Sequence, residues 1–394
     1  MRTIAVFTGA RAEFGLLRPL LEAVRDDPGL RLRLLVSGMH LSPEFGLTRA
    51  EIEASGFTLD EAVEMLVSSD TRIGQTKSMG LALIGYGEAL ARLAPDILVV
   101  LGDRFEAFCA ATAATILGLP LAHVHGGEAT QGAVDECLRH AITKMSHLHF
   151  TSTEAYRRRV IQLGERPGRV FRVGALGIEC IRRFALLSPA EAESRLGFPL
   201  GGRYLLATYH PVTLETEGAS GLSALLAALE DFPDLRVVFT QANADAEGRE
   251  VNRRLAEYAA SRPDRVAVRA SLGQTLYLSL MARAAAVVGN SSSGLLEAPA
   301  LGVPSVDIGD RQKGRIRPAS VLHCRPEAGK VCASLAKALD PAFRASLTDM
   351  DNPYEGRCPS ADILGVLKTA DLTDILKKDF YDLPFQPESF SGGD

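Results

Sequence analysis

The chain has 394 residues, of which 46% are hydrophobic and 23% charged, and its 43 Lys and Arg against 48 Asp and Glu give a formal net charge of -5. This is the composition of a globular protein of two or three domains, and the acidic balance argues against nucleic acid as a partner, because phosphate backbones demand clustered Lys and Arg. No apolar run approaches the roughly 20 residues that span a bilayer, and no signal peptide precedes the first strand-like run, so we expect no membrane partner. The six scattered cysteines form no C-x-x-C pair. Reduced thiols and a cytoplasmic location are therefore expected.

The predicted elements alternate between strand and helix along the whole chain. Strands are predicted in the first half at residues 3–7, 32–36, 96–101, 121–125, 147–151 and 170–173, and in the second half at 204–208, 237–240, 266–269, 285–288 and 305–308. Helical patterns lie between them, for example at 16–25, 80–93, 105–117 and 134–145. Several strands are nearly continuous apolar runs, which is typical of parallel strands buried on both faces. The alternation predicts a doubly wound, parallel α/β architecture.

The strand–helix pattern runs twice, with a break around residues 177–202. Within the break, Ser188 is suited to be a helix N-cap, Pro189 occupies the first helical position and Glu191 follows three residues after the cap. This combination predicts the start of a short helix.

We therefore predict two Rossmann-like domains, residues 1–178 and 200–360, joined by a linker helix at 179–199. A helix and tail at 361–394 complete the chain. Its helical stretch, ending at Lys378, is expected to pack back across both domains, and the last ten residues are expected to be frayed.

Polar residues collect where the predicted strands end. In the first half these stretches are 9–13, 37–40, 102–106 and 125–128, and in the second half 209–211, 241–245, 289–294 and 310–315. Ligands of open α/β sheets bind outside the carboxyl ends of the strands. Two domains that face each other with these ends would form a cleft, suited to a substrate with a charged nucleotide end and a neutral sugar end.

The segment from Gly289 to Glu297 is the clearest candidate anion site. A strand ends in glycine, three serines including Ser291 and Ser292, and another glycine, after which a helix begins. A helix N-terminus offers free N–H groups and a positive dipole end to a diphosphate, and Glu297 could accept hydrogen bonds from ribose hydroxyls. A serine-capped helix with no ligand is the alternative reading.

Five arginines fall in the same layer of loops: Arg11, Arg104, Arg311, Arg315 and Arg317. Guanidinium groups bind phosphate in a bidentate manner. The set therefore favours phosphate binding, although a surface salt bridge is an adequate account of any single member.

Acid–base chemistry is indicated near the middle of the first half. Asp103 follows an apolar strand, where poor hydration can raise its pKa; the alternative is an N-cap for the next helix. His125 and Glu128 flank two glycines, where a substrate can approach the backbone. Asp135 opens a helix and makes an i, i+4 pair with Arg139.

Cofactors are not expected from these patterns. No G-x-G-x-x-G follows the first strand, which argues against nicotinamide chemistry. The histidines and carboxylates lack tight metal-ligand spacing, and buried, hydrogen-bonded histidines explain them as well as a metal would.

Taken together, these stretches resemble the hydrolysing UDP-N-acetylglucosamine 2-epimerases of the bacterial sialic-acid-pathway type. The matching stretches are 8–15, 38–40, 101–106, 123–128, 139–146, 210–211, 243–245, 289–297, 308–315 and 378–384. The resemblance covers about 380 residues and both predicted domains.

The resemblance implies a GT-B-like fold with the site between the domains. It implies that UDP-N-acetylglucosamine and water give N-acetylmannosamine and UDP, by elimination of UDP to a 2-acetamidoglucal and hydration of that intermediate. By similarity, Asp103 and Asp135 do the acid–base work, and either His125 or Glu128 provides the second proton-transfer group. The residues implied in binding substrate and nucleotide are Arg11, Arg104, Arg139, His210, Asn243, Ser291, Ser292, Glu297 and Arg311.

Four alternatives remain beside this hypothesis: a non-hydrolysing epimerase, a hydrolysing epimerase of a UDP-diacetamido-trideoxy sugar, a glycosyltransferase, and a UDP-sugar-binding protein without activity. The turn after His125 and the pair Arg139 and His140 favour the hydrolysing branch. No cofactor or metal is implied. A homo-oligomer, either a dimer or a tetramer, is expected.

Overall fold

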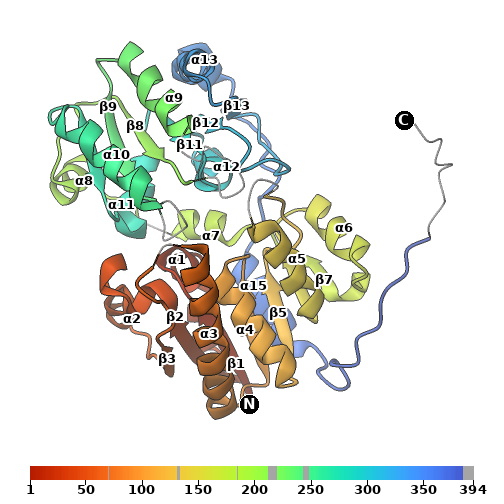
Figure 1. Ribbon diagram of the computed structural model, residues 1–394. Helices are drawn as coiled ribbons and strands as arrows, with labels where there is room; N and C mark the ends of the chain where they lie inside the picture. Colours follow the sequence, from red (N-terminus) through yellow and green to blue (C-terminus); the bar gives the residue numbers. More distant parts are fainter. Residues whose placement is uncertain (70, 131–133, 184, 212–219, 243–247, 385–394) are drawn as a thin grey trace, which may run out of the picture.

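A computed structural model describes residues 1–69, 71–130, 134–183, 185–211, 220–242 and 248–384 of the chain. Two α/β lobes lie one above the other, each built on its own parallel sheet (Figure 1). The predicted tail at 385–394 and the predicted binding residue Asn243 lie outside the described residues.

The N-terminal lobe contains a seven-stranded parallel sheet in the order β3-β2-β1-β4-β5-β6-β7. Its strands are β1 Arg2–Thr8, β2 Leu30–Ser37, β3 Glu61–Val63, β4 Ile97–Leu101, β5 Leu121–Val124, β6 Leu148–Thr151 and β7 Val170–Arg172. The chain reverses its direction of travel through the sheet beside β1, so the switch point lies between β1 and β4. This sheet confirms the predicted doubly wound architecture.

The C-terminal lobe repeats the arrangement with six parallel strands in the order β10-β9-β8-β11-β12-β13. Its strands are β8 Tyr204–Thr208, β9 Arg236–Thr240, β10 Val266–Arg269, β11 Ala286–Gly289, β12 Ser305–Ile308 and β13 Val321–Cys324. The edge strands β3 and β13 were not predicted. β3 has three residues and β13 buries only its two ends, so neither produces a continuous apolar run.

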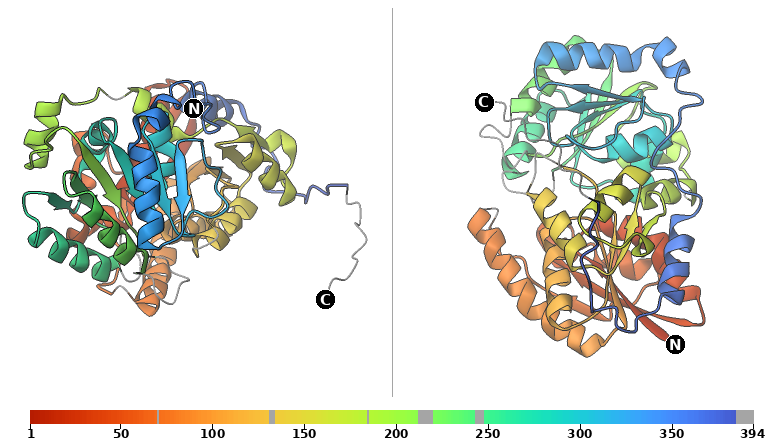
Figure 2. Two further views of the ribbon diagram at one scale, coloured as in Figure 1. Left: turned by 90° about the horizontal axis from the view of Figure 1, so that it is seen from above. Right: turned by 90° about the vertical axis from the view of Figure 1, so that its right-hand side faces the viewer.

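Helices cover both faces of each sheet (Figure 2). They are α1 Arg11–Asp26, α2 Arg49–Ala54, α3 Arg72–Leu93, α4 Phe105–Ile116, α5 Asp135–Met145, α6 Glu154–Gln162, α7 Leu176–Arg183, α8 Pro189–Leu196, α9 Ser220–Ala228, α10 Gly248–Ala260, α11 Gly273–Met281, α12 Ser293–Ala300, α13 Ala328–Leu339, α14 Pro341–Ala345 and α15 Pro359–Thr369. Short 3₁₀ turns occur at η1 Gly38–Leu41, η2 Pro43–Phe45, η3 Pro167–Arg169 and η4 Leu229–Asp231.

Alternation along the central strand β1 divides the core of the N-terminal lobe into two layers. Ile4 and Val6 point to the side covered by α1 and α15, whereas Ala5 and Phe7 point to the side covered by α3 and α4. Successive strand residues face opposite sides of a sheet, so one apolar strand supplies both cores.

The linker between the lobes has the predicted helix start. Ser188 Oγ accepts the Glu191 N–H at 3.3 Å, and the Ser188 N–H donates to Glu191 Oε2 at 2.9 Å. The helix α8 ends at Gly197, whose φ of 62° lies in the left-handed region that favours glycine. This capping box is confirmed.

The last helix, α15, packs against α1 and α7. Its Ile363 and Leu367 belong to the core of the N-terminal lobe. The predicted packing against the N-terminal domain is thus seen, and the helix ends at Thr369 rather than at Lys378.

All six cysteines are free thiols, as predicted. Within the described ranges, no helix is both long enough and apolar enough to cross a membrane.

Candidate functional site

Asp103 lies two residues beyond the end of β4, and the central feature of its surroundings is Arg139. The guanidinium of Arg139 is 1% exposed and its Nη2 donates to Asp103 Oδ2 and to Thr130 Oγ1. Its Nη1 donates to the Glu128 carbonyl at 2.9 Å and to Glu136 Oε2 at 2.8 Å. Arg139 thus joins α5 to the loops after β4 and β5, and it holds the Asp103 carboxylate in one orientation.

This arrangement corrects two expectations for Asp103. The N-cap of α4 is Arg104, not Asp103. Burial raises the pKa of the Asp103 carboxyl, but the attraction of Arg139, Arg315 and Arg311 outweighs it, so the pKa is lowered rather than raised. Asp103, 22% exposed, is therefore ionised at neutral pH and suited to accept a proton.

Arg139 itself was expected to contact substrate. In the structure its buried guanidinium contacts protein oxygens, and the carboxylates that it pairs with are those of Asp103 and Glu136. We therefore interpret Arg139 as a positioning residue for Asp103. Asp135, at the start of α5, lies one turn before Arg139 and is half-buried.

His125 follows β5 and adopts a φ of 64°, which is rare for a residue with a side chain. Its Nε2 accepts the N–H of Leu176 at 3.3 Å, so the neutral ring carries its proton on Nδ1. That nitrogen lies 3.7 Å from Glu128 Oε1. Burial lowers the pKa of His125, and Arg315 and Arg139 add to the effect, so the ring is neutral at pH 7.

Glu128 is held by groups from both lobes. Its Oε1 accepts the Ser152 hydroxyl at 2.9 Å, and its Oε2 lies 3.2 Å from Nη1 of Arg315. The Arg315 side chain is 9% exposed and also donates from Nε to the Ala129 carbonyl at 3.2 Å. Burial lowers the pKa of Arg315, but Glu128 and Asp103 more than compensate and raise it. An arginine of the C-terminal lobe therefore completes the charge balance of the N-terminal site.

A pair of buried tyrosines fixes the loop that carries this arginine. The Tyr156 and Tyr354 hydroxyls are 2.9 Å apart, Tyr354 donates to the Ile316 carbonyl at 2.8 Å, and the Ile316 N–H donates to the Tyr156 hydroxyl at 3.1 Å. Both rings belong to one apolar cluster with Leu296 of α12. The position of Arg315 is thus set by packing between the lobes.

The loop after β1 carries a second group of charges. The Gly9 and Ala10 N–H groups donate to Glu13 Oε2 at 2.7 and 3.1 Å. Arg104 donates to both oxygens of the fully buried Glu106, at 3.1 and 2.9 Å. Burial raises the pKa of Glu13 to about 7, against the attraction of Arg104. Arg104, expected to hold phosphate, therefore has a carboxylate partner within its own lobe.

Arg11 stands at the first position of α1. Its side chain is partly exposed, and Nη1 lies 3.9 Å from Glu51 Oε1. Burial lowers the pKa of Arg11. A surface ion pair of this length contributes little to stability. The guanidinium of Arg11 can therefore exchange it for an ion pair with a phosphate.

The corresponding part of the C-terminal lobe is built from neutral groups. Gly289, at the end of β11, has a φ of 139°, and a Cβ there would lie 1.9 Å from the Thr208 carbonyl. Asn290 accepts the His210 N–H at 2.7 Å and donates to the His210 carbonyl at 2.7 Å. These contacts bring the loop after β8 against the start of α12.

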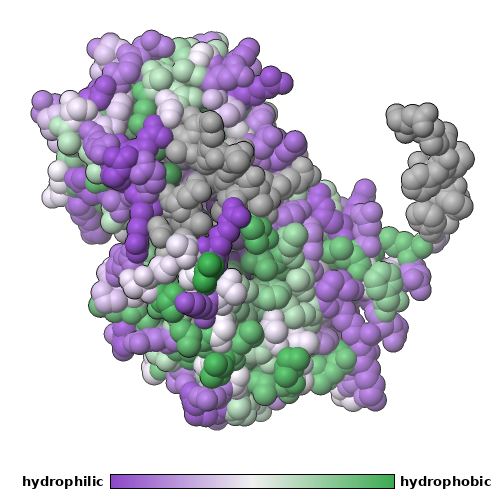
Figure 3. Space-filling view, viewed as in Figure 1, coloured by the Kyte–Doolittle hydropathy of each residue, from purple (hydrophilic) through white to green (hydrophobic). Residues whose placement is uncertain are grey.

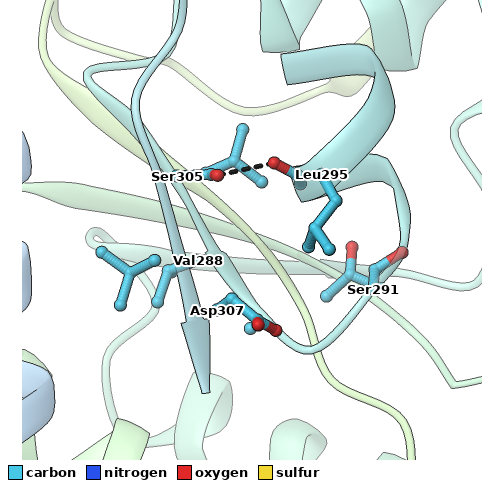
Figure 4. Close-up of a pocket in the computed structure, with 10 residues that line it drawn as sticks. Val288, Ser291, Leu295, Ser305 and Asp307 are labelled. Carbon is cyan, nitrogen blue, oxygen red and sulfur yellow. Dashed lines mark hydrogen bonds between the residues drawn. The ribbon is translucent and has the colours of Figure 1, made fainter. Parts of the chain in front are cut away.

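The serines after Asn290 begin the helix. Ser292 is the N-cap of α12 but makes no side-chain cap, and the Ser293 hydroxyl donates to Ser291 Oγ at 3.1 Å. A small pocket behind this turn, with room for about one water molecule, is lined by Ser291, Leu295 and residues of β11 and β12 (Figure 4). The nucleotide phosphates predicted for this site would therefore lie in front of the helix N-terminus.

Glu297 lies one turn into α12 and faces Gly177 of helix α7. A Cβ at Gly177 would lie 3.1 Å from Glu297 Oε1, and Oε2 is buried with no hydrogen-bond partner. Burial raises the pKa of Glu297 to about 7, although Arg315 opposes the shift. An unpaired buried carboxyl oxygen is a costly group, which a ligand hydroxyl would satisfy.

The three C-terminal arginines differ in position. Arg311 donates from Nη1 to the Asn290 carbonyl at 3.2 Å, directly behind the α12 turn. Arg315 crosses to Glu128. Arg317 instead pairs with Asp307, with Nε 3.0 Å from Oδ2, so a structural ion pair accounts for it.

Two other histidines of the N-terminal lobe, His123 and His149, each have a protein partner. His123 contacts Thr143 Oγ1 and the Gly102 carbonyl, and His149 Nε2 lies 2.9 Å from Glu165 Oε2. Among the residues that the structure describes, no group of three His, Cys, Asp or Glu side chains is placed to hold a metal ion.

The sequence placed Glu13 and Glu106 in polar stretches after strands but indicated no role for either, and it did not single out the two tyrosines. Arg315 was expected to be one of the phosphate-binding arginines, not a partner of Glu128. Glu13 had a signal: it stands at the third position of a helix that follows a strand and a glycine turn. The tyrosines had none, because their partners are 198 residues apart.

The chain is similar to known proteins over nearly its whole length. A family model described as UDP-N-acetylglucosamine 2-epimerase matches residues 22–368. The chain is 39% identical over 384 residues to a Campylobacter jejuni protein named GDP/UDP-N,N'-diacetylbacillosamine 2-epimerase (hydrolyzing), covering 97% of this chain and 99% of the relative. It is 36% identical over 392 residues to the Escherichia coli polysialic acid biosynthesis protein P7, covering 98% of each.

Among solved structures, UDP-GlcNAc 2-epimerase from Methanocaldococcus jannaschii, in complex with UDP-GlcNAc and UDP, superimposes with a TM-score of 0.76 at 18% identity. The match covers 93% of this chain and 99% of that one. This likeness confirms the expected GT-B-like fold.

Proposed function

Because this chain belongs to the UDP-N-acetylglucosamine 2-epimerase family, we propose that it is a cytoplasmic hydrolysing epimerase that converts UDP-N-acetylglucosamine and water to N-acetylmannosamine and UDP. The observation that carries the proposal is the group formed by Asp103, His125 and Glu128, which Arg139 and Arg315 hold in place between the lobes. The product would feed the synthesis of sialic or related nonulosonic acids.

The first step is an elimination. An ionised Asp103 takes the proton from C2 of the sugar, the C2–H electron pair becomes the C1–C2 double bond, and the C1–O bond breaks with its electrons leaving on UDP. The products are 2-acetamidoglucal and UDP. The lowered pKa of Asp103 keeps the base ionised, and Arg139 fixes its orientation.

The second step is a hydration. Water adds its oxygen to C1, and C2 receives a proton on the opposite face, which gives N-acetylmannosamine. We assign this proton transfer to the pair His125 and Glu128, because the Nδ1 proton of His125 faces the Glu128 carboxylate. Asp135, at the start of α5, is the second carboxylate implied by the family resemblance.

The C-terminal lobe binds the nucleotide in this proposal. The N-terminus of α12, with Ser291 and Ser292, and Arg311 beside it, would stabilise the diphosphate, and Glu297 would accept the ribose hydroxyls. His210, after β8, and Arg11 of the N-terminal lobe, at the first position of α1, complete the set. No metal or other cofactor takes part.

A second candidate is the same reaction on a UDP-diacetamido-trideoxy sugar. It is favoured by the 39% identity to the Campylobacter jejuni protein, whose name includes diacetylbacillosamine. The two substrates differ at C4 and C6 of the sugar, far from the C1 and C2 atoms where the reaction occurs.

Proton NMR in D₂O, without added metal, tests the proposal. UDP-N-acetylglucosamine should give free UDP and N-acetylmannosamine that carries deuterium at C2. Formation of UDP-N-acetylmannosamine would assign the chain to the non-hydrolysing branch. Reaction of the diacetamido-trideoxy substrate alone would establish the second candidate, and binding of UDP with neither reaction would contradict both.

A further inference from the structure

A second cavity, of about 200 Å³, lies in the N-terminal lobe at the edge of the sheet opposite the candidate active site. Two of the residues that line it, His147 and Arg169, directly precede β6 and β7, whereas Asp103 follows β4. Its outer wall is the chain after α15, from Asp374 to Asp379. The cavity is larger than the roughly 150 Å³ cavity in which an engineered protein binds benzene, so it can hold a small molecule.

The surroundings of this cavity are polar. In Figure 3 hydrophilic side chains predominate along the right-hand edge of the lower lobe, where Figure 1 shows α6 and β7. The residues that line the cavity include the four cations Arg166, Arg169, Lys377 and Lys378, and a single aliphatic side chain, Ile375. A polar or charged ligand therefore suits the cavity better than an apolar one.

Lys378 fixes the wall that the C-terminal segment forms. Its Nζ donates to the carbonyls of Lys144 and Ser146 at 2.7 and 2.6 Å, where α5 ends, and it lies 2.7 Å from Glu165 Oε2. Glu165 is 2% exposed, and its other carboxylate oxygen accepts from Lys144 Nζ at 2.7 Å. Because Lys378 and Glu165 already have protein partners, they build the cavity and leave the binding of a ligand to other groups.

His147 provides a donor that the protein itself does not use. Its Nδ1 accepts the Leu121 N–H at 3.1 Å, so the neutral ring carries its proton on Nε2. Burial and the charge of Lys378 lower the pKa of His147 to about 4, so the ring is neutral at pH 7. Among the described residues Nε2 has no hydrogen-bond partner, and it is not enclosed by protein. A ligand in the cavity can accept this hydrogen bond.

Arg169 provides the charge. Its Nη1 donates to the Asp371 carbonyl at 3.3 Å, and within the described part of the chain it forms no ion pair. The Asp371 carboxylate instead accepts the Thr373 N–H at 2.9 Å. A guanidinium presents its N–H groups in a planar fork that matches the oxygens of a carboxylate or a phosphate. Arg169 is thus available to an anion.

The two other cations at the rim already have partners. Arg166 pairs with Asp379, and Lys377 Nζ lies 2.6 Å from Asp374 Oδ1. Both pairs are exposed, so they contribute little to stability and can rearrange around a bound ion. The carboxylates at the rim are therefore neutralised by their own partners and do not repel an anion at Arg169.

We propose that this cavity binds a small oxyanion, the carboxylate or phosphate group of a small molecule, between Arg169 and His147. Arg169 donates two parallel hydrogen bonds to the anion, and His147 Nε2 donates a third. The bound charge also attracts Lys377, and so holds the segment after α15 against the lobe. This inference concerns binding alone and does not depend on the reaction proposed above.

An NMR titration of the full chain tests the proposal. The Cε1–H signal of His147, assigned by its absence from His147→Gln, is followed during addition of inorganic phosphate and, separately, of acetate. Sodium chloride keeps the ionic strength constant, and saturating UDP occupies the interlobe cleft. A saturable shift with phosphate alone, with acetate alone or with both supports the proposal and identifies the acidic group of the ligand. A signal that neither anion moves to saturation would overturn it.

A substitution locates the site. Arg169→Gln should raise the dissociation constant of the anion at least about tenfold, because it removes a charge-assisted hydrogen bond. The matched control is Arg158→Gln, since Arg158 is an exposed arginine on α6 that pairs with Glu154 and does not line the cavity. It should bind the anion as the parent does. Equal affinities in the parent and in Arg169→Gln would overturn the assignment, and the titration of the parent decides the proposal if Arg169→Gln does not fold.

Discussion

The two lobes have the same fold, but their halves of the candidate site consist of different kinds of residue. In the N-terminal lobe, Asp103 and Glu128 are held by the arginines Arg139 and Arg315. In the C-terminal lobe, the loop after β11 consists of glycine, asparagine and serines, and the side chain of Asn290 holds it through hydrogen bonds with the backbone of His210. Fixed charges suit proton transfer, whereas a helix N-terminus with small residues suits an anion that must bind and leave.

This contrast teaches that one strand order can carry two different sets of loop residues. Both sheets place their loops at the carboxyl ends of parallel strands, beside a central strand where the order reverses. What differs is the set of residues that follows each strand. Four predictions, from the largest expected effect to the smallest, test whether the two halves act separately.

The largest effect is expected for Asp103→Asn. The amide cannot accept the C2 proton, so kcat should fall by roughly 10²–10⁴-fold, the usual worth of a general base. Because Asp103 belongs to the N-terminal half, the dissociation constant for UDP measured by calorimetry should change little. Turnover close to that of the parent protein would remove Asp103 from the reaction.

The pair of Glu128 and Arg315 is expected to affect stability as well as turnover. Arg315→Met leaves the buried Glu128 carboxylate without its partner, which should lower the free energy of unfolding by about 3–5 kcal/mol. Adding Glu128→Gln should recover most of that loss but no activity, as urea unfolding and the NMR assay would show. If the single variant were as stable as the parent, the interlobe ion pair would not support the fold.

Arg311→Ala should alter binding rather than chemistry. Loss of a charge-assisted contact to phosphate should weaken the binding of UDP by about 1.5–3 kcal/mol. The dissociation constant should rise on the order of 10–100-fold. At saturating substrate kcat should be nearly unchanged. Arg317→Ala is the matched control, since Arg317 pairs with Asp307, and its affinity for UDP should equal that of the parent. Equal affinities in all three proteins would contradict the phosphate assignment of Arg311.

The smallest effect concerns pH. Glu297 has a pKa raised to about 7 in the fold, above the value of 4.5 for a free side chain, so its protonated form is the one that the fold favours. Its contribution to stability is fully present below pH 4.5 and is lost as the pH rises through about 7. Glu13 behaves in the same way. In the parent protein the free energy of unfolding should fall between pH 4.5 and about 7, and in Glu297→Gln it should fall less steeply. Urea unfolding at several pH values measures this slope. The same slope in both proteins would contradict a raised pKa at Glu297.

Much of the fold followed from local pattern. The apolar runs of β1, β4 and β8 and the capping box at Ser188 were predicted from spacing alone, because these features depend on neighbours within a few residues. The short edge strand β13 was missed because half of its residues are not buried, so the signal on which strand prediction depends was weak.

The sequence named candidate site residues but not the side chains that they contact. His125, Glu128 and Asp103 were all named from their place after strands. The pKa of Asp103 was expected to rise with burial, and it falls instead because Arg139, 36 residues away, donates to it. The sequence does not distinguish an exposed arginine on a helix from a buried one. The partner of Arg139 could therefore not be predicted.

The sequence by itself determined the parallel sheets and the edge on which the polar loops gather, since these depend on the two-residue and 3.6-residue periods of strands and helices. Only the tertiary structure decided which charges meet. Arg315 lies 187 residues after Glu128, and its pairing depends on how the lobes pack around Tyr156 and Tyr354. Charge interactions depend on distance in space and on exclusion of water, and neither quantity is written in the local order of residues.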